Sequence, residues 1–441
     1  MRLSRTVRGR SRESVDFLIE NADELVTLAG SSQMPRVGKQ MRELGVVHNG
    51  GLAIKDGKIL AVGKTVDLVK VFKAENIINA NGKTVLPGFV DPHTHLVFAG
   101  SREDEFQMRI EGASYLEILG SGSGILKTVK ETRRASVEKL VDSGIRTLDA
   151  MLEHGTTAVE AKSGYGLTTK DELKILEVIK RMNQLHCLDV VSTFMGAHAI
   201  PPEYKGNAQS YANLVTEDMI PKVAERGLAE FCDVFCERGV FSLEQSRRIL
   251  VSGKNHGLKS KIHADEMSVM GGAECAADVG AVSAEHLLFS SQEGIKAMAA
   301  KGVIAVLLPV AAFSLMMGRY ADARLMIDSG VPVALGTDFN PNCWAESMQL
   351  VIAFACHFMK LISAEAITAA TINAAHAIGR AADVGSLEVG KKADVLVLNV
   401  PSHKFLGYCF GVNLVDKVIK NGRLVVDREK ESETVFLREP E

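Results

Sequence analysis

The chain has 441 residues, of which 46% are hydrophobic and 24% are charged, an ordinary globular mix. This length exceeds the usual size of a single hydrophobic core and predicts one large domain with a smaller one. A formal net charge of −3 gives no electrostatic basis for binding nucleic acid or anionic lipid, so neither is an expected partner.

The first 86 residues combine an Arg-rich tail with strand-like, turn-rich sequence. Residues 1–13 have no apolar segment, so we interpret them as a flexible basic tail rather than a secretory signal; an organelle transit segment is the alternative. In residues 14–86, short apolar runs alternate with turns, and Asp56-Gly57 is typical of a tight hairpin. We expect a small β domain here.

After Gly88, short apolar strands alternate with amphipathic helices. Eight strands are predicted at residues 85–95, 156–166, 189–198, 232–237, 258–266, 281–287, 302–310 and 331–341. In the intervening segments, apolar residues recur at three- and four-residue spacing. This alternation predicts a TIM-like (β/α)8 barrel over residues 87–385. A doubly wound open sheet is the alternative, but the first strand lacks the Gly-rich dinucleotide fingerprint.

The C-terminal segment returns to strands and turns after a strongly helical stretch at residues 362–379. Asn421-Gly422 is a second hairpin signal. We expect residues 386–430 to join residues 14–86 in one composite β-sandwich, with the barrel inserted between its halves. Residues 431–441 are interpreted as a tail.

Two further features concern membranes and redox chemistry. The longest apolar run, residues 303–317, is too short to span a bilayer and is interpreted as a buried strand leading into a loop. Seven dispersed cysteines argue against a disulfide framework and for a reducing compartment, so we expect a cytoplasmic protein. Cys232 and Cys236 lack a second pair to complete a structural zinc site and are interpreted as core residues.

Ligand-type side chains stand at the ends of three predicted strands. His93 and His95 are two apart, so a strand directs both to one face, at the catalytic end of such barrels. His263 ends the fifth strand and Asp338 the eighth. One histidine alone would be interpreted as a core residue, but three nitrogens and a carboxylate predict a metal site with room for water. Zinc, iron or manganese suits this set.

Three more polar residues at strand ends suggest proton transfer. Glu266 lies three positions after His263. His286 ends the sixth predicted strand, and His198 ends the third. His286 and Asp338 are candidates to take a proton from a metal-activated water, and Glu266 is a candidate to deliver one to the leaving atom.

Several motifs together resemble one family. "PGFVDPHTHLVFAGSREDEF", "KSGYGL", "GAHAIPPEY", "HADE", "SAEHL" and "GTDFNPN" are similar to the imidazolonepropionases of the amidohydrolase superfamily, over nearly the whole chain after the first dozen residues. The resemblance implies hydrolysis of the cyclic amide of 4-imidazolone-5-propanoate to N-formimidoyl-L-glutamate, in histidine degradation. It also implies a bound Zn²⁺ or Fe³⁺ ion and a homodimer.

The resemblance assigns substrate contacts. Arg102 alone would be interpreted as a solvated loop charge, but the family makes it the group that grips the propionate carboxylate. Tyr165, His198 and Asn340 become further substrate contacts, with Glu266 beside them. Tyr115 is a weaker candidate that equally suits packing.

Asn342 and Cys343 depart from the family pattern, and Lys162 bears on the number of metal ions. Asn342 and Cys343 stand where many bacterial members carry Gly and a small hydroxyl residue, and animal members carry Asn at the first position, so the contacts of this pair with substrate are open. Some superfamily members bridge two metals with a carboxylated lysine on the fourth strand. The predicted fourth strand has no lysine, and Lys162 lies on the second, so one ion per subunit is expected.

Two other functions compete with this interpretation. A deaminase of the same superfamily also uses the His-x-x-Glu spacing of "HADE", although Arg102 and "KSGYGL" favour a substrate with a carboxylate. A non-catalytic scaffold on the same fold is the more remote alternative, because such proteins typically lose the metal ligands that this chain retains.

Overall fold

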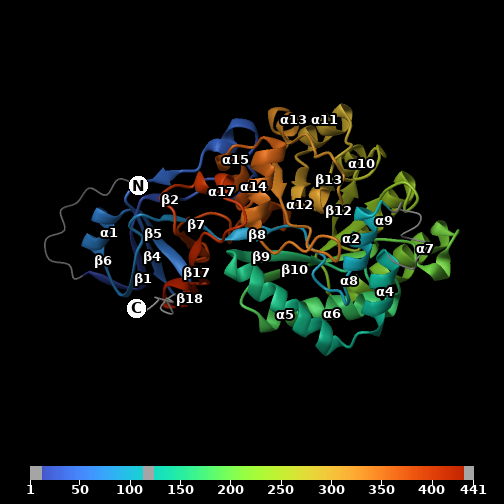
Figure 1. Ribbon diagram of the computed structural model, residues 1–441, viewed down its shortest axis with the longest axis horizontal. Coiled ribbons are helices and arrows are strands. Elements are labelled where there is room, and N and C mark those ends of the chain that lie inside the picture. Colours follow the sequence, from blue (N-terminus) through green and yellow to red (C-terminus); the bar gives the residue numbers. More distant parts are fainter. Residues whose placement is uncertain (1–11, 113–123, 432–441) are drawn as a thin grey trace, which may run out of the picture.

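The computed structural model describes residues 12–112 and 124–431, and its largest sheet is a barrel of eight parallel strands (Figure 1). The strands follow one another around the barrel in chain order. They are β8 (Phe89–Asp91), β9 (Thr156–Lys162), β10 (Asp189–Ala197), β11 (Phe231–Cys236), β12 (Lys259–Ala264), β13 (Ser283–His286), β14 (Ile304–Leu307) and β15 (Val333–Leu335). The predicted (β/α)8 barrel is therefore confirmed, and the open-sheet alternative is wrong.

The barrel closes just beyond the ends of its first and last strands. Thr94 and Phe339 form an isolated parallel bridge. The Asp338 amide donates to the His93 carbonyl at 3.0 Å, and the His95 amide donates to the Phe339 carbonyl at 2.8 Å. The closure thus fixes the backbone of three predicted metal ligands.

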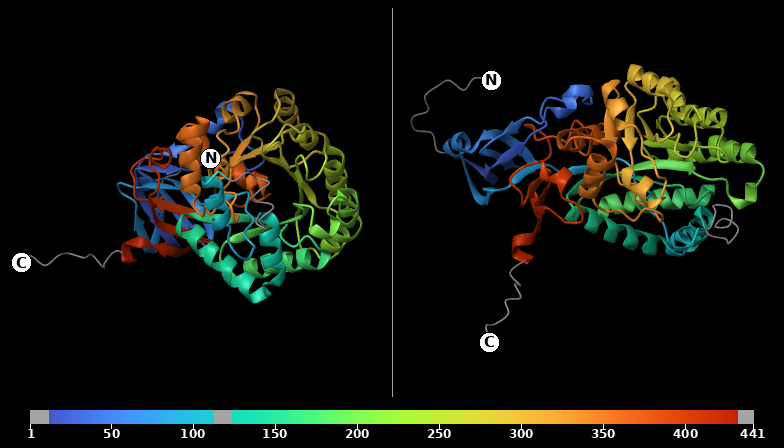
Figure 2. Two further views of the ribbon diagram at one scale, coloured as in Figure 1. Left: turned by 45° about the vertical axis from the view of Figure 1, so that its right-hand side comes forward. Right: turned by 45° about the horizontal axis from the view of Figure 1, so that its top comes forward.

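Helices cover the outside of the barrel (Figure 2). Side-chain N-caps begin several of them, including Ser136, Thr168 and Ser242. The helices are α2 (Glu103–Ile110), α4 (Ile125–Arg134), α5 (Val137–Glu153), α6 (Thr169–Leu185), α7 (Ala208–Leu214), α8 (Ile220–Glu225), α9 (Leu243–Asn255), α10 (Gly272–Val279), α11 (Gln292–Lys301), α12 (Pro309–Ser314), α13 (Ala323–Asp328), α14 (Met348–Met359), α15 (Ser363–Ala369) and α16 (Ile372–Ala377), with the short turns η2 (Pro202–Tyr204) and η3 (Val215–Met219).

Strands from both ends of the chain build two smaller sheets beside the barrel (Figure 1). The first contains β5 (Lys58–Lys64), β4 (Gly50–Lys55), β1 (Glu13–Ala22) and β6 (Phe72–Asn79). The second contains β18 (Arg423–Asp427), β17 (Val415–Lys420), β16 (Val395–Leu398), β7 (Thr84–Pro87), β2 (Glu24–Val26) and β3 (Val46–Val47). The remaining elements are η1 (Gly38–Arg42), α1 (Thr65–Val71), α17 (Phe405–Tyr408) and α18 (Arg428–Glu431).

The predicted composite β domain is confirmed by this pairing. β16, from the C-terminal half, lies between β17 and the N-terminal strand β7. Both predicted hairpin turns adopt left-handed backbone conformations, with φ of 51° and 75° at Asp56-Gly57 and 49° and 74° at Asn421-Gly422. The domain boundaries at residues 86/87 and 385/386 stay a prediction.

Two local predictions were wrong. The predicted first strand, 85–95, is two strands, because β7 pairs in the composite sheet and β8 in the barrel. Gly88 lies between them, and a Cβ there would overlap the Thr157 side chain, so only glycine fits. The segment expected to be a loop after the seventh barrel strand instead forms α12, with Pro309 in its first turn.

No helix within residues 12–112 and 124–431 is both long and apolar enough to cross a membrane.

Candidate metal centre and active site

A buried threonine–aspartate contact joins the ends of β8 and β15 below the candidate metal site. The Asp91 carboxylate accepts from the Thr337 hydroxyl at 2.5 Å, the Thr337 amide at 3.1 Å and the His93 amide at 3.3 Å. Burial raises the Asp91 pKa to about 6, and the three donors oppose that rise. This contact sets the directions of His93 and of the segment that carries Asp338.

Three imidazole nitrogens and one carboxylate oxygen converge at the C-terminal end of the barrel. Nε2 of His263 lies 3.3 Å from Nε2 of His95. Oδ1 of Asp338 lies 3.4 Å from Nε2 of His93 and 3.7 Å from Nε2 of His95. Ligands about 2.1 Å from a shared ion are separated by about 3.4 Å along the edge of a tetrahedron. The four predicted ligands therefore have the spacing of a metal site. His93, His95 and Asp338 form one group close enough to hold an ion, and His93 and His263 form a second such group with His286.

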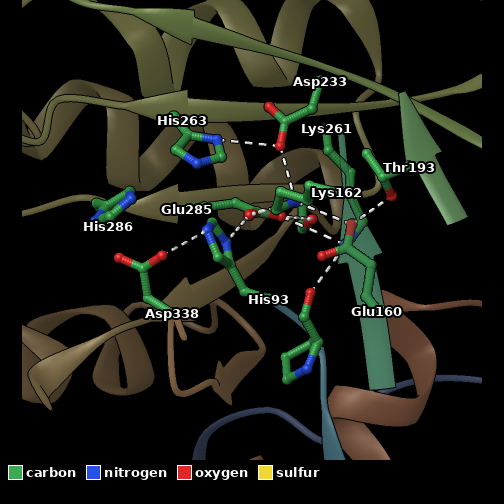
Figure 3. A network of polar contacts seen from close by, with 12 residues as sticks. His93, Glu160, Lys162, Thr193, Asp233, Lys261, His263, Glu285, His286 and Asp338 are labelled. Carbon is green, nitrogen blue, oxygen red and sulfur yellow. Dashed lines mark hydrogen bonds and ion pairs between the residues drawn. The ribbon is translucent and has the colours of Figure 1, made fainter. Parts of the chain in front are cut away.

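Two of these histidines are backed by buried carboxylates (Figure 3). Nδ1 of His263 lies 3.0 Å from Oδ2 of Asp233, and Nδ1 of His93 contacts Oε2 of Glu285. Metal-binding histidines characteristically present their second nitrogen to a carboxylate in this way. Burial lowers the His93 pKa, but Glu285 outweighs it and raises the pKa to about 9; a cation at Nε2 would take the place of that proton.

Glu266 and His286 form an acid–base pair beside the converging ligands. Nδ1 of His286 lies 3.6 Å from Oε1 of Glu266, and its ring centroid lies 5.1 Å from that of His263. Burial raises the Glu266 pKa to about 8, reinforced by the Asp338 and Glu237 charges. Burial lowers the His286 pKa to about 3. At neutral pH Glu266 therefore carries a proton and His286 does not, which is the state of a proton donor and a proton acceptor.

Backbone strain also concentrates at this end of the barrel. His286 and Asp338 adopt φ of 70° and 51°, and Asp265, beside His263, adopts 50°. Such left-handed conformations cost non-glycine residues roughly 1–3 kcal/mol and cluster at functional sites. The side chains of His286 and Asp338 lie at the shared centre, whereas the Asp265 carboxylate accepts from the amides of Gly272 and Ala273 at the start of α10.

His198 and Tyr165 border the centre on a second side. The His198 ring stacks on His95 with centroids 4.6 Å apart and planes 15° apart, and the Tyr165 ring lies 5.2 Å from His198. Nδ1 of His198 lies 3.1 Å from the Gly164 carbonyl, which requires a proton on Nδ1 and leaves Nε2 as an acceptor. Burial lowers the His198 pKa to about 3 and raises that of Tyr165 far above its ordinary value.

The loop that presents Tyr165 is held by Glu172, which lies in the first turn of α6. Its carboxylate accepts from the amides of Gly164 at 3.0 Å and of Gly166 and Leu167 at 2.7 Å each. Glu172 is fully buried. It is thus a structural anchor of the "KSGYGL" motif.

Arg102 is held in a defined orientation at the N-terminus of α2. Its Nε and Nη2 donate to the two carboxylate oxygens of Glu105 at 2.8 and 3.0 Å, which leaves the Nη1 side of the guanidinium outside this pair. Arg109 donates to Glu105 at 3.3 Å and to Oδ1 of Asn342 at 2.9 Å. Because Arg102 is paired with Glu105 and is only 9% exposed, it is not a solvated loop charge.

The loop after β15 folds back on itself around Asn340. Asn340 donates from Nδ2 to the Asp338 carbonyl at 2.7 Å and accepts from the Asn342 amide at 2.7 Å. Cys343 is buried, with its thiol 3.5 Å from the Thr337 carbonyl. The polar groups of Asn342 and Cys343 are thus engaged within the protein, whereas Asn340 is adjacent to a candidate ligand.

The remaining candidates fall outside the centre. Tyr115 lies outside the described residues. Cys232 and Cys236 are buried free thiols. The residues that sequence reasoning missed are Asp233, Glu285, Glu105 and Glu172. A signal existed for Asp233, since it is a lone acid in an otherwise apolar strand.

Comparisons with known proteins agree over almost the entire chain. Residues 84–425 match the model of the Amidohydrolase family. The chain is 54% identical over 417 residues to the imidazolonepropionase of Alkaliphilus metalliredigens, and 55% identical over 420 residues to that of Geobacillus kaustophilus. Each alignment covers 94% of this chain and 99% of the relative.

Solved structures match at the level of fold. An adenosine deaminase from Xanthomonas campestris with bound zinc has a TM-score of 0.70 at 18% identity, covering 97% of this chain and 96% of that one. Escherichia coli guanine deaminase has a TM-score of 0.69 at 16% identity, covering 93% and 99%. Together with the family match, the clustered histidines and acids indicate a metal-binding protein.

Proposed function

The chain belongs to the amidohydrolase family, with imidazolonepropionases as relatives over nearly its whole length, and from this premise we propose that it hydrolyses 4-imidazolone-5-propanoate to N-formimidoyl-L-glutamate in histidine degradation. The observation that carries the proposal is the convergence of His93, His95, His263 and Asp338 at the spacing of metal ligands. Glu266, whose pKa is raised to about 8 by burial, lies beside them.

One ion, Zn²⁺ or Fe³⁺, would be held by Nε2 of His93, His95 and His263 and by Oδ1 of Asp338. When bound, it would supply Lewis-acid polarisation of a water molecule and of the ring carbonyl. One ion per subunit is proposed because the Lys162 ammonium is paired with three carboxylates and so is not a bridging ligand.

Arg102, Tyr165 and His198 would hold the substrate, with Asn340 on the opposite side. Arg102 would take the propionate carboxylate on the guanidinium edge that Glu105 leaves open. Nε2 of His198, free to accept, suits a ring N–H. Asn342 and Cys343 enter the proposal through the loop they form around Asn340.

Proton transfer would be divided between two residues. His286 would accept a proton from the attacking water, with Asp338 as the alternative acceptor, while Glu266 would deliver its proton to the ring nitrogen as the carbon–nitrogen bond breaks. The nitrogen stays in the product, so no ammonia is released. That is the difference from a deaminase.

The assay that tests the proposal follows ring absorbance and ammonia together, using metallated protein and fresh 4-imidazolone-5-propanoate. Ring loss without ammonia is expected. Ammonia release from an amino-purine or amino-pyrimidine panel, with an intact imidazolone ring, would favour the deaminase. Inertness of a fully metallated sample toward every substrate would favour the non-catalytic scaffold.

Arg102→Met is expected to raise KM for the imidazolone by about 100-fold, because two charge-assisted hydrogen bonds are lost. The kcat should change less, since Arg102 would act on an arm remote from the scissile bond. Steady-state kinetics measure both. Arg134→Met is the control. Arg134 is an exposed residue at the C-terminal end of α4, so this substitution should leave KM unchanged. An unchanged KM in Arg102→Met would refute the carboxylate role.

We further propose a cytoplasmic homodimer. All seven cysteines, each within the described residues, are free. A chain of ring contacts over α12 and α14 leaves Phe313 55% and Phe358 47% exposed, with Tyr320 stacked on Phe358 at 4.8 Å. Exposed aromatic rings in contact are typical of an interface core.

Phe358→Glu is therefore expected to convert the dimer to a monomer, because a charge would be buried at the proposed interface. Light scattering after size-exclusion chromatography measures the mass. Ile77→Glu, at a 57% exposed position on β6, is the matched control and should remain dimeric. A dimer that survives Phe358→Glu would place the interface elsewhere.

A further inference from the structure

A fully buried group of five charged side chains lies beneath the candidate metal ligands (Figure 3). Its members, each with a side chain 0% exposed, are Glu160, Lys162, Asp233, Lys261 and Glu285. Burying charges is costly unless they are paired in good geometry. Five charged side chains gathered inside one barrel therefore require a physical explanation.

Lys162 is the hub of this group. Its Nζ lies 2.8 Å from Oδ2 of Asp233, 2.9 Å from Oε1 of Glu160 and 3.1 Å from Oε2 of Glu285. The ammonium donates hydrogen bonds to Asp233 and Glu160, and its contact with Glu285 is an ion pair. The chain places them on β9, β11 and β13, alternate strands that contribute to one layer of a barrel interior.

Two of the oxygens that Lys162 contacts also face ligand histidines. Oδ2 of Asp233 lies 2.8 Å from Lys162 and 3.0 Å from Nδ1 of His263. Oε2 of Glu285 lies 3.1 Å from Lys162 and contacts Nδ1 of His93. One ammonium is therefore joined to two imidazoles, each through a single oxygen atom.

We propose that Lys162 is a positioning residue for the metal centre: through Asp233 and Glu285 it sets the orientation of His263 and His93 together. With Lys162 holding each carboxylate, both Nδ1 atoms face a fixed oxygen atom, and the Nε2 side of each ring is directed to the shared centre. The two ligands are then ordered as a unit before an ion binds. The inference rests on the proposed metal site but not on the identity of the substrate.

Lys261 provides a matched control within the same group. Its side chain is equally buried, and its contacts are Oε1 of Glu160 at 3.1 Å, Oε1 of Glu285 at 3.4 Å and the Pro92 carbonyl at 3.2 Å. It thus touches Glu285 on the oxygen that does not face His93. Removing either lysine changes the buried charge by the same amount, but only Lys162 connects both histidines.

The experiment compares Lys162→Met with Lys261→Met in full-length, metal-free protein. Zn²⁺ affinity is measured by competition with a chromophoric chelator, and the visible absorption of the Co²⁺ form reports ligand geometry. Lys162→Met is expected to bind Zn²⁺ about 10–100-fold more weakly than wild type and to alter the Co²⁺ spectrum. Lys261→Met should stay close to wild type in both.

Equal losses in the two variants would overturn the proposal, since only neutralisation of buried charge would then matter. So would wild-type affinity in Lys162→Met. Either result would leave the hydrolase proposal standing, whereas wild-type protein that binds no metal would refute the proposed function itself.

Asp233→Asn and Glu285→Gln keep the inference testable if Lys162→Met does not fold, since both substitutions preserve side-chain shape. Each is expected to weaken Zn²⁺ binding with a small change in thermal unfolding. The double variant Asp233→Asn/Glu285→Gln should lose less affinity than the sum of the two single losses, because both act through one ammonium. Strict additivity would show that the histidines are positioned independently.

Discussion

His263→Ala is expected to abolish metal retention and to lower kcat by about 1,000-fold. A metal ion supplies several kcal/mol of transition-state stabilisation, and each ~1.4 kcal/mol is worth a factor of ten. His263 is the proposed ligand on β12, and its Nε2 lies 3.3 Å from Nε2 of His95. The substitution would remove one of the four proposed ligand atoms. Metal content by mass spectrometry and single-turnover kinetics measure the two effects.

His256→Ala is the control for this prediction. His256 is the C-cap of α9, and its Nδ1 lies 2.9 Å from the Ser252 carbonyl. It should retain metal and activity with at most a small loss of stability. A His263→Ala protein that keeps both a full complement of metal and wild-type kcat would remove His263 from the ligand set.

Glu266→Gln is expected to lower kcat by about 10²–10⁴-fold, the usual contribution of a positioned proton donor. Glutamine fits the same space but has no carboxyl proton to give. Because burial raises the Glu266 pKa to about 8, the wild-type residue is protonated at pH 7 and loses its proton as the pH rises through 8. The wild-type rate should therefore fall on the alkaline side, and this fall should be absent from the variant.

Glu237→Gln tests the same assignment through a neighbour. The Glu237 charge contributes to the raised pKa of Glu266, so its removal should move the alkaline fall to lower pH and leave the maximal kcat nearly unchanged. The pH dependence of kcat for all three proteins is the measurement. Persistence of the alkaline fall in Glu266→Gln would assign it to another group.

Much of the fold follows from local pattern, because β/α alternation and turn chemistry are properties of short segments. All eight barrel strands and both Asp/Asn-Gly hairpins were predictable for that reason. The division of 85–95 into β7 and β8 was not, since the apolar run continues across it. Which sheet each half joins is decided by tertiary contacts, such as that between Gly88 and Thr157.

The candidate site was predictable where strand ends bring polar residues together. His93 and His95 are two apart, and a strand turns that spacing into a shared face. The supporting charges were harder to assign, because Lys162 acquires a role only from Asp233 and Glu285, which lie on other strands. The period-two pair Glu160/Lys162 in a buried strand is the signal that such an interior group leaves in the sequence.

The closing bridge between Thr94 and Phe339 bears on how the protein is made. Synthesis proceeds from the N-terminus, so His93 and His95 leave the ribosome long before Asp338, and β7 long before its partner β16. His93 and His95 therefore lack the neighbouring Asp338 carboxylate until the last barrel strand has been synthesised. For the proposed metal site, loading is then expected late in biogenesis, and a nascent chain that stalls before residue 338 would present an incomplete ligand set.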